Sequence, residues 1–195
     1  MALRRGGGGR GATPGPAGKD DQSTGRLGGK AEDHTPDRYK MREKLLSIGD
    51  DFWIETMKGR RAYKVDGKAL RLRNTLVLED PRGNAVYEIQ AKVVAIKDTM
   101  AVSKPHGREV AVVKHALISP LRDKMSANMA DGPDIEIRGN ILNHEYTMER
   151  RGKRICEVSK KWIAIRDTYT VEVDAGEDDA LLLALTVVVE QMCQE

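Results

Sequence analysis

Short runs in which apolar and polar residues alternate make up most of the chain after Tyr39, and turn signals separate one run from the next. Alternation with a period of two places the apolar side chains on one face of a strand. Amphipathic helices would instead repeat their apolar residues every three or four positions. The pattern therefore predicts an antiparallel β protein and not an alternation of helices with strands.

The strongest turn signal is the dipeptide Asp66–Gly67, which lies between the alternating runs 61–65 and 69–73. Asp-Gly favours the left-handed backbone that a two-residue hairpin turn requires. We therefore expect these two runs to pair directly as a hairpin. In that register Tyr63 would lie opposite Leu70.

A second turn is predicted over residues 80–84, where Pro81 takes the second position of the turn and Gly83 lies near its end. This order matches a type I turn that is closed by a left-handed glycine. The turn would join the apolar run 76–78 to the alternating run 85–89.

Two segments of the chain, 83–100 and 152–169, resemble each other at an offset of 69 residues. Gly, Glu, Lys, Ala, Ile, Asp and Thr recur in register between them. Two copies are too few for a solenoid. The repeat therefore predicts two similar hairpin-to-strand passages in one barrel.

The C-terminus breaks the alternating pattern. Residues 176–179 carry acidic side chains where a helix dipole favours them, and the apolar run 180–189 follows. This run is apolar on every helical face, so we expect a helix that is buried on all sides. The run is about half of the ~20 residues that span a bilayer. A β-barrel with the helix through its lumen accounts for both features.

Residues 1–38 form a Gly-rich segment with almost no large apolar side chains, and we expect it to be disordered. The remaining residues, 39–195, fit a single domain. No apolar stretch follows the first residues, so we expect a cytoplasmic protein without a secretory signal. Cys156 and Cys193 are expected to be reduced thiols without a disulfide.

The overall charge is nearly balanced, with 33 basic and 30 acidic residues and a formal net charge of +3. The predicted tail carries +2 of this charge and the predicted domain carries +1. This balance does not point to a nucleic-acid-binding protein.

The chain resembles the LURP-one-related family over residues 39–194. The matching segments are 48–54, 63–68, 167–173 and the acidic-to-apolar end 177–192. The fold of this family is shared with the tubby C-terminal domain and is similar to that of phospholipid scramblases. The resemblance implies a closed antiparallel barrel of about twelve strands around the C-terminal helix.

Two of these related groups act on lipids, since tubby domains bind phosphoinositides through basic surface residues and scramblases act on phospholipids. Scramblases that resemble this fold tend to carry proline-rich and cysteine-rich elements near the domain. This chain lacks those elements. A scramblase-like, lipid-active protein is therefore kept only as an alternative.

The sequence shows no catalytic constellation, so we predict no catalytic residues, no metal site and no cofactor. There is no nucleophile elbow, phosphate loop or dinucleotide fingerprint. The repeated Asp98 and Asp167 are expected to bond nearby backbone at strand starts. Four histidines are scattered without metal-ligand spacing and are expected to be ordinary surface or strand residues: His34, His106, His115 and His144.

Basic residues gather in two places along the chain. Residues 58–73 hold seven basic side chains and one acid, and a two-residue turn at Asp66 would place Arg60 opposite Arg73. A second basic cluster spans residues 150–161. We take six residues as candidates for anion binding: Arg60, Lys64, Arg71, Arg73, Arg151 and Lys153. The alternative is a solvated basic face that is partly balanced by the acidic C-terminal end.

These observations favour a non-enzymatic cytoplasmic binding or scaffold module, which could also act at the membrane periphery. Its basic face would engage an anionic partner, either a phospholipid headgroup or an acidic protein surface. Nucleic-acid binding through the same face is a second hypothesis, which the aromatic content of 4% disfavours. A lipid-active enzyme is a third, although the helix should fill the lumen. The oligomeric state stays open.

Overall fold

The computed structural model describes residues 35–42, 51–67, 75–92, 99–115, 124–161 and 167–194. The first strand, β1, begins at Asp37, so the predicted domain boundary at Tyr39 lies inside this strand. The rest of the predicted tail, residues 1–34, lies outside the described residues.

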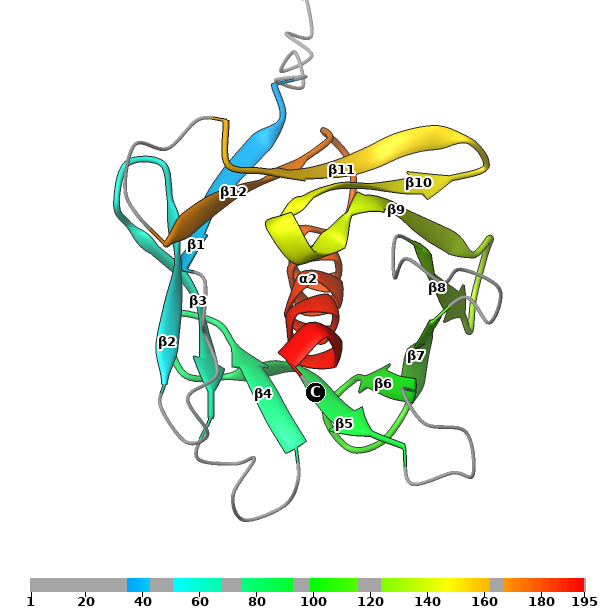
Figure 1. Ribbon diagram of the computed structural model, residues 1–195. Helices are drawn as coiled ribbons and strands as arrows, with labels where there is room; N and C mark the ends of the chain where they lie inside the picture. The colour runs from blue at the N-terminus through cyan, green and yellow to red at the C-terminus, as the bar shows by residue number, and fades with distance from the viewer. Residues whose placement is uncertain are drawn as a thin grey trace, which may run out of the picture. The chain divides into compact units, whose positions relative to one another are not determined.

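Within the described part of the chain, twelve antiparallel strands close into one barrel (Figure 1). Each strand pairs with its neighbours in sequence, and β1 pairs with β12 to close the ring. The strands are β1 (Asp37–Arg42), β2 (Phe52–Thr56), β3 (Arg61–Asp66), β4 (Thr75–Glu79), β5 (Ala85–Ala91), β6 (Thr99–Ser103), β7 (Glu109–His115), β8 (Lys124–Met129), β9 (Ile135–Asn140), β10 (Glu145–Arg150), β11 (Lys153–Ser159) and β12 (Thr168–Val173). The 3-10 turn η1 (Ile141–Asn143) precedes β10, and the helix α2 (Asp179–Gln194) follows β12. The predicted barrel is confirmed.

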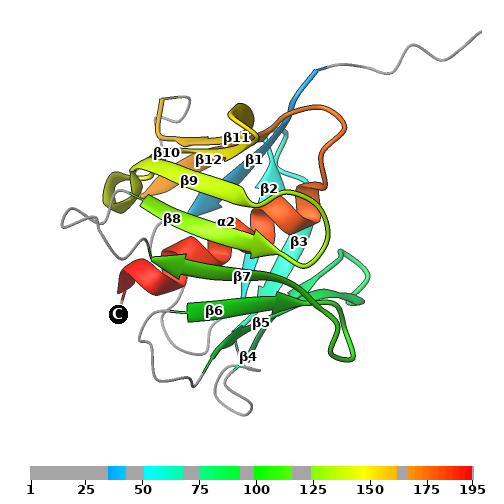
Figure 2. The same cartoon turned by 90° about the vertical axis from the view of Figure 1, so that its right-hand side faces the viewer.

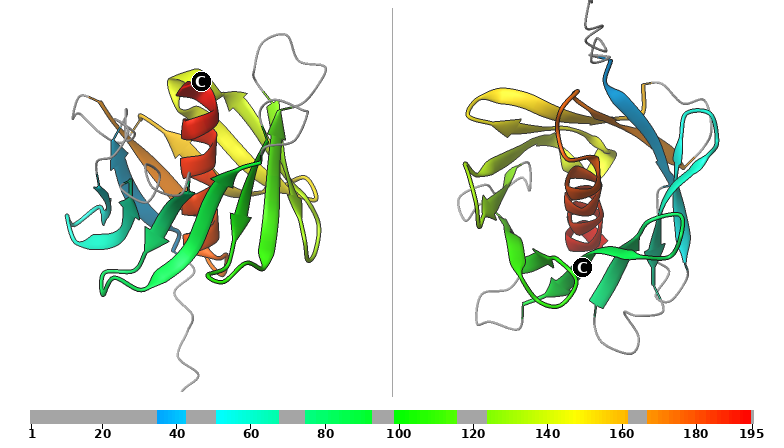
Figure 3. Two further views of the ribbon diagram at one scale, coloured as in Figure 1. Left: turned by 90° about the horizontal axis from the view of Figure 1, so that it is seen from below. Right: turned by 180° about the vertical axis from the view of Figure 1, so that it is seen from behind.

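The helix α2 runs through the lumen of the barrel, as Figures 1 and 2 show from two directions and Figure 3 from two more. Seven helix residues, Leu182–Val188, each have 0% exposure. The barrel wall supplies the opposing apolar side chains, because alternate residues of the strands point inward. Burying one such leucine or valine contributes roughly 1.5–3 kcal/mol. The prediction that the helix is buried on every side is confirmed.

Two aspartates and two tyrosines fix the start of α2 to the barrel wall. The Asp178 carboxylate caps the helix, since it accepts hydrogen bonds from the Leu181 N–H and the Tyr87 hydroxyl, both at 2.9 Å. The Tyr39 hydroxyl donates to Asp179 at 2.9 Å. Burial and this hydrogen bond raise the pKa of Tyr39 well above its ordinary value. Tyr39 therefore remains a hydrogen-bond donor at any physiological pH.

The turn predicted over residues 80–84 is confirmed. The Asp80 carboxylate accepts hydrogen bonds from the backbone N–H groups of Arg82 at 2.8 Å and Asn84 at 2.9 Å. Gly83 has φ +85°, the left-handed conformation that closes the turn between β4 and β5.

The two-residue hairpin predicted at Asp66–Gly67 is wrong. Strand β3 pairs with β4, and Val65 lies opposite Leu78 and not opposite a residue of 69–73. The expected pairs of Tyr63 with Leu70 and of Arg60 with Arg73 fail with it. Burial explains the difference, because Leu76 and Leu78 of β4 are fully buried and continue the inward apolar row that includes Val65. Residues 68–74 themselves lie outside the described residues.

The internal repeat corresponds to equivalent parts of the barrel. The first copy begins at left-handed Gly83 and contains β5 and the start of β6. The second copy begins at left-handed Gly152 and contains β11 and the start of β12. In both copies, part of the connection between the two strands lies outside the described residues. The described parts confirm the predicted correspondence.

Candidate binding site at the seam between β1 and β2

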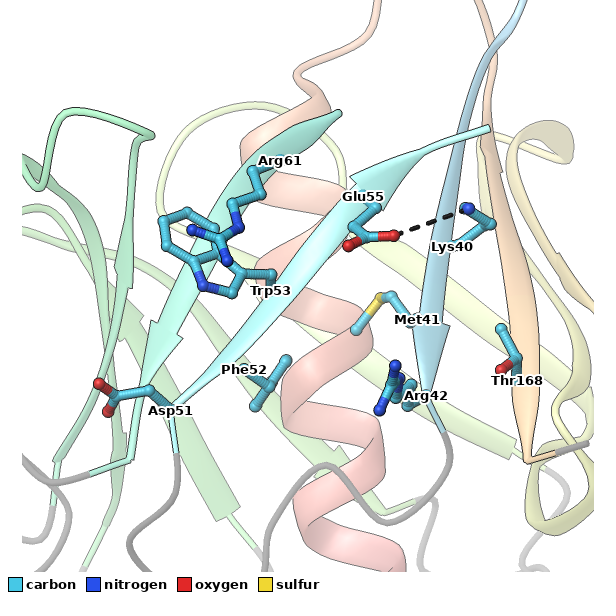
Figure 4. Close-up of a pocket in the computed structure, with 9 residues that line it drawn as sticks. All are labelled: Lys40, Met41, Arg42, Asp51, Phe52, Trp53, Glu55, Arg61 and Thr168. Atoms are coloured by element: carbon cyan, nitrogen blue, oxygen red, sulfur yellow. Dashed lines mark ion pairs between the residues drawn. The ribbon is translucent and has the colours of Figure 1, made fainter. Parts of the chain in front are cut away.

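The barrel has a seam where β1 and β2 diverge. Along its whole length β1 pairs with β12, but its ladder with β2 contains only the pairs Tyr39–Thr56 and Lys40–Glu55. Beyond these pairs a cavity of about 360 Å³ lies at the seam (Figure 4). This volume is within the range of pockets that hold small organic ligands.

The described lining of the cavity comes from β1, β2, β3, β12 and the residue before β2. Three of its side chains are cationic, two are acidic and four are uncharged. They are Lys40, Met41, Arg42, Asp51, Phe52, Trp53, Glu55, Arg61 and Thr168.

The apolar part of the lining is continuous with the core of the barrel. Met41 has 1% exposure and belongs to the core. Phe52 is partly buried and packs against the same core. Figure 4 shows Met41 in the space between β1 and β2. The cavity therefore offers apolar contacts on the side of the protein interior.

Lysines neutralise both acids of the cavity lining. The Lys40 ammonium lies 3.6 Å from the Glu55 carboxylate. Lys64 on β3 lies 3.1 Å from the Asp51 carboxylate and 3.3 Å from the Glu79 carboxylate. Desolvation lowers the pKa of Lys64, but its hydrogen bonds to the two carboxylates outweigh this effect and raise the pKa above its ordinary value. Lys64 therefore keeps its positive charge at neutral pH.

Two arginines of the lining have no ion pair with a carboxylate in the described residues. Arg42 is exposed at the end of β1. The Arg61 guanidinium carbon lies 4.4 Å from the centre of the Trp53 ring, in a cation–π contact that leaves its charge without a counter-ion. The three cations and two carboxylates of the described lining sum to a formal charge of +1.

The structure describes two of the predicted anion-binding residues around Asp66, Arg60 and Lys64. Arg60 is exposed in the turn between β2 and β3, whereas Lys64 lies between two carboxylates. Arg71 and Arg73 lie outside the described residues. Anion binding by this set stays a prediction.

The second predicted cluster lies elsewhere on the barrel. Arg151 is exposed in the turn between β10 and β11, and Lys153 is exposed at the start of β11. In the strand order, β1 and β12 lie between this hairpin and the β2–β3 hairpin. Their neighbour Arg150 pairs with Glu177 at 2.6 Å, and Arg154 pairs with Asp174 at 3.3 Å. The acidic C-terminal end thus balances part of this cluster. Anion binding by Arg151 and Lys153 also stays a prediction.

His144 differs from the expected surface or strand histidine. It ends η1 in a left-handed conformation with φ 56°, and its Nε2 lies 2.8 Å from the Glu190 carboxylate of α2. Its ring stacks on Tyr169 with 4.5 Å between the ring centres. His144 thus connects the barrel wall with the C-terminal half of the helix.

The described residues contain no group of three or more side chains that could hold a metal ion.

Sequence reasoning missed Arg42 and Trp53, which lie outside both basic clusters. Arg61 was counted in the first cluster but was not chosen as a candidate. No local pattern marks these three residues as neighbours. They line one cavity because β1 and β2 diverge after two pairs.

Comparisons with known proteins agree with the fold. An X-ray structure of a protein from Arabidopsis thaliana is similar to this chain with a TM-score of 0.62 and 17% identity, and the match covers 83% of this chain and 93% of that one. No curated protein sequence shows a significant match. Among the described residues, no helix has the length and apolar character needed to cross a membrane. The family model described as LURP-one-related matches residues 38–190, so the resemblance is confirmed and the chain belongs to the LURP-one-related family.

Proposed function

We propose that this protein is a non-enzymatic binding module that holds the anionic headgroup of a phospholipid in the seam cavity. One observation carries the proposal: Arg42 and Arg61, which form no ion pair with a carboxylate in the described residues, line a cavity that also has apolar walls. An anion in the cavity would supply the missing counter-charge.

The chemistry of the two arginines favours a phosphate group. A guanidinium is planar and presents its N–H groups as a fork that matches phosphate oxygens. The contact with Trp53 holds the Arg61 side chain against one wall. A ligand phosphate would therefore meet a side chain whose conformation is already restricted, which lowers the entropic cost of binding.

The position of Trp53 favours a membrane lipid over an acidic protein surface as the source of the phosphate. Tryptophan is enriched at membrane–water interfaces because its ring is amphipathic. Basic residues close to an anionic membrane contribute about 1 kcal/mol each to binding. We therefore place the protein in the cytoplasm, where it would bind the anionic leaflet reversibly.

Co-sedimentation with liposomes tests the proposal. Liposomes of phosphatidylcholine alone are compared with liposomes that also contain phosphatidic acid, over a range of salt concentrations. The unmodified protein should sediment only with the anionic liposomes, and the bound fraction should fall as salt screens the attraction. Sedimentation with neutral liposomes to the same extent would contradict the proposal.

Three double substitutions with the same change in net charge identify the surface that binds. The first, Arg42→Glu with Arg61→Glu, alters the seam cavity. The second, Arg151→Glu with Lys153→Glu, alters the exposed β10–β11 turn. The third is a control, Arg82→Glu with Lys114→Glu, at two exposed positions outside the cavity lining.

Only the cavity variant should lose binding, with an affinity at least tenfold lower than that of the control. Equal losses in all three variants would show nonspecific attraction to net charge. A loss confined to the β10–β11 variant would instead support the site predicted from the sequence. If the unmodified protein ignores anionic liposomes but binds an acidic protein or a nucleic acid, the lipid proposal fails.

A further inference from the structure

The turn between β2 and β3, residues 57–60, exposes an apolar side chain together with cations. Met57 is 41% exposed and is one of two exposed large hydrophobic residues in the described part of the chain. Lys58 and Arg60 of the same turn are exposed as well. In Figures 1 and 3 this cyan turn lies at the outer edge of the barrel. Both kinds of side chain are therefore accessible to a partner.

The positive charge of the β2–β3 turn has no counter-charge among the described residues. The turn contains no acid, and neither Lys58 nor Arg60 forms an ion pair with a described carboxylate. Other turns of the barrel differ in this respect. The β4–β5 turn contains Asp80, and Arg108 between β6 and β7 lies 2.6 Å from the Asp131 carboxylate. An anionic partner would supply the counter-charge that the β2–β3 turn lacks.

Hydrogen bonds hold the β2–β3 turn in one conformation. The Thr56 N–H donates to the Arg60 carbonyl at 2.8 Å, and the Gly59 N–H donates to the Thr56 carbonyl at 2.9 Å. The Arg60 N–H also donates to the Thr56 hydroxyl at 3.2 Å. Gly59 has φ +76°, the left-handed conformation that glycine adopts without strain. A partner therefore meets an ordered turn, which lowers the entropic cost of binding.

The combination of Met57 with two cations fits the surface of an anionic membrane. Basic side chains are attracted to anionic headgroups, and an apolar side chain beside them can enter the boundary between headgroups and acyl chains. The hydrocarbon stems of lysine and arginine lie along apolar surface while their charged ends reach the headgroups. A nucleic acid or another soluble polyanion would be bound through the charges alone. The exposed methionine therefore favours the membrane.

We infer that the β2–β3 turn is a membrane-docking element, in which Met57 inserts between the lipids of an anionic surface and Lys58 and Arg60 contact their headgroups. The turn lies outside the lining of the seam cavity, so it makes a second and separate contact. This inference rests on the proposed function only for the choice of a membrane as the partner.

Charge reversal in the turn tests the contact with headgroups. Lys58→Glu with Arg60→Glu is compared with Arg82→Glu with Lys114→Glu, which changes the net charge equally at exposed positions outside the turn. Each basic residue close to an anionic membrane strengthens binding about fivefold, so the turn variant should bind liposomes with phosphatidic acid at least twentyfold more weakly. The control should lose much less.

A matched pair of substitutions tests the apolar contact. Met57→Ser should weaken binding to the anionic liposomes roughly three- to tenfold, because it removes the apolar atoms that insert. Leu142→Ser is the control, since Leu142 is 53% exposed and lies outside the turn. It should leave binding unchanged, and Met57→Leu should retain the binding of the unmodified protein.

Quenching by lipids with brominated acyl chains measures insertion directly. Met57→Trp and Leu142→Trp are each combined with Trp162→Phe, so that both proteins keep Trp53 as a common background. Only Met57→Trp should show quenching beyond this background. Equal quenching of the two proteins would contradict insertion of the turn.

The outcomes for the turn and for the seam cavity are distinguishable. Turn variants that keep full binding to anionic liposomes overturn the inference, and a loss confined to Arg42→Glu with Arg61→Glu then leaves the headgroup site in place. A loss confined to the turn variants supports the inference and contradicts the headgroup site. If charge reversal weakens binding but Met57→Ser does not, the turn meets charge alone and the inference fails. If the unmodified protein ignores anionic liposomes, both proposals fail.

Discussion

Leu183 in α2 provides the sharpest test of how this fold is held together. Its exposure is 0%, and its neighbours Leu182 and Ala184 are equally buried. Replacing Leu183 with Ala removes three buried carbons and leaves a cavity that the surrounding barrel cannot close completely. Such changes reduce the free energy of unfolding by about 3–5 kcal/mol.

Replacing Leu183 with Asp adds a second cost, because the carboxylate would lack a partner in an apolar interior. The total stability of a domain is about 5–15 kcal/mol, and an unpaired buried charge costs several kcal/mol beyond the loss of packing. We therefore expect Leu183→Ala to fold with a reduced melting temperature and Leu183→Asp to be largely unfolded at neutral pH. For a domain of this size, the loss in the Ala variant lowers the melting temperature by roughly 6–20 °C.

Thermal and urea unfolding followed by circular dichroism measure both effects. Leu142→Ala is a matched control, because Leu142 is 53% exposed and its truncation should change stability by less than about 0.5 kcal/mol. A Leu183→Asp protein that melts cooperatively at the temperature of the unmodified protein would refute the argument that the helix must be buried.

Four further predictions concern other parts of the chain. Arg151→Asn should raise the free energy of unfolding, measured by urea denaturation, by about 0.5–1 kcal/mol, because Arg151 has a left-handed conformation that Asn adopts more easily. A decrease in this free energy would show that the Arg151 side chain stabilises the turn. Tyr87→Phe should lower that free energy by about 1.5–3 kcal/mol, since it removes the hydrogen bond to the helix-capping carboxylate of Asp178. Burial raises the pKa of Asp179, so the folded state disfavours its ionised form. The free energy of unfolding of the unmodified protein, compared with that of Asp179→Asn, should therefore rise as the pH falls from 7 through this raised pKa. Urea unfolding in which this difference falls with decreasing pH would contradict the prediction. We also propose that residues 1–34 lie outside the folded domain, so deleting them should leave the melting temperature unchanged.

The architecture could be predicted where local sequence imposes a physical requirement. An apolar run with no polar face must be buried on all sides, so 180–189 predicted an internal helix before any contact was known. The alternation of apolar and polar residues predicted the surrounding β-strands. The pairing of β3 could not be predicted in the same way, because Asp66–Gly67 is a local turn signal and strand register depends on distant burial. Val65 pairs with Leu78 because that register places buried side chains together.

The candidate site could be predicted only in part, because the sequence shows where charges occur and not which of them are paired. Lys64 lies in the most basic segment, yet two carboxylates balance it. Arg154 likewise pairs with acids from β12 and the loop that follows. Arg42 has no such partner in the described residues and lies outside both clusters. Because these ion pairs join residues of different strands, a high density of basic residues in one segment did not indicate which cations lack a carboxylate partner.

Strand β1 explains why the proposed site can be tested separately from the fold. Its inward residues are structural, since Tyr39 donates to Asp179 at the helix start and Met41 belongs to the core. Its residues Lys40 and Arg42 alternate with these inward residues and line the cavity. Six pairs with β12 hold the strand in place even where its ladder with β2 ends. Reversing the charge of Arg42 should therefore weaken anion binding while the inward face of the same strand keeps the barrel closed around its helix.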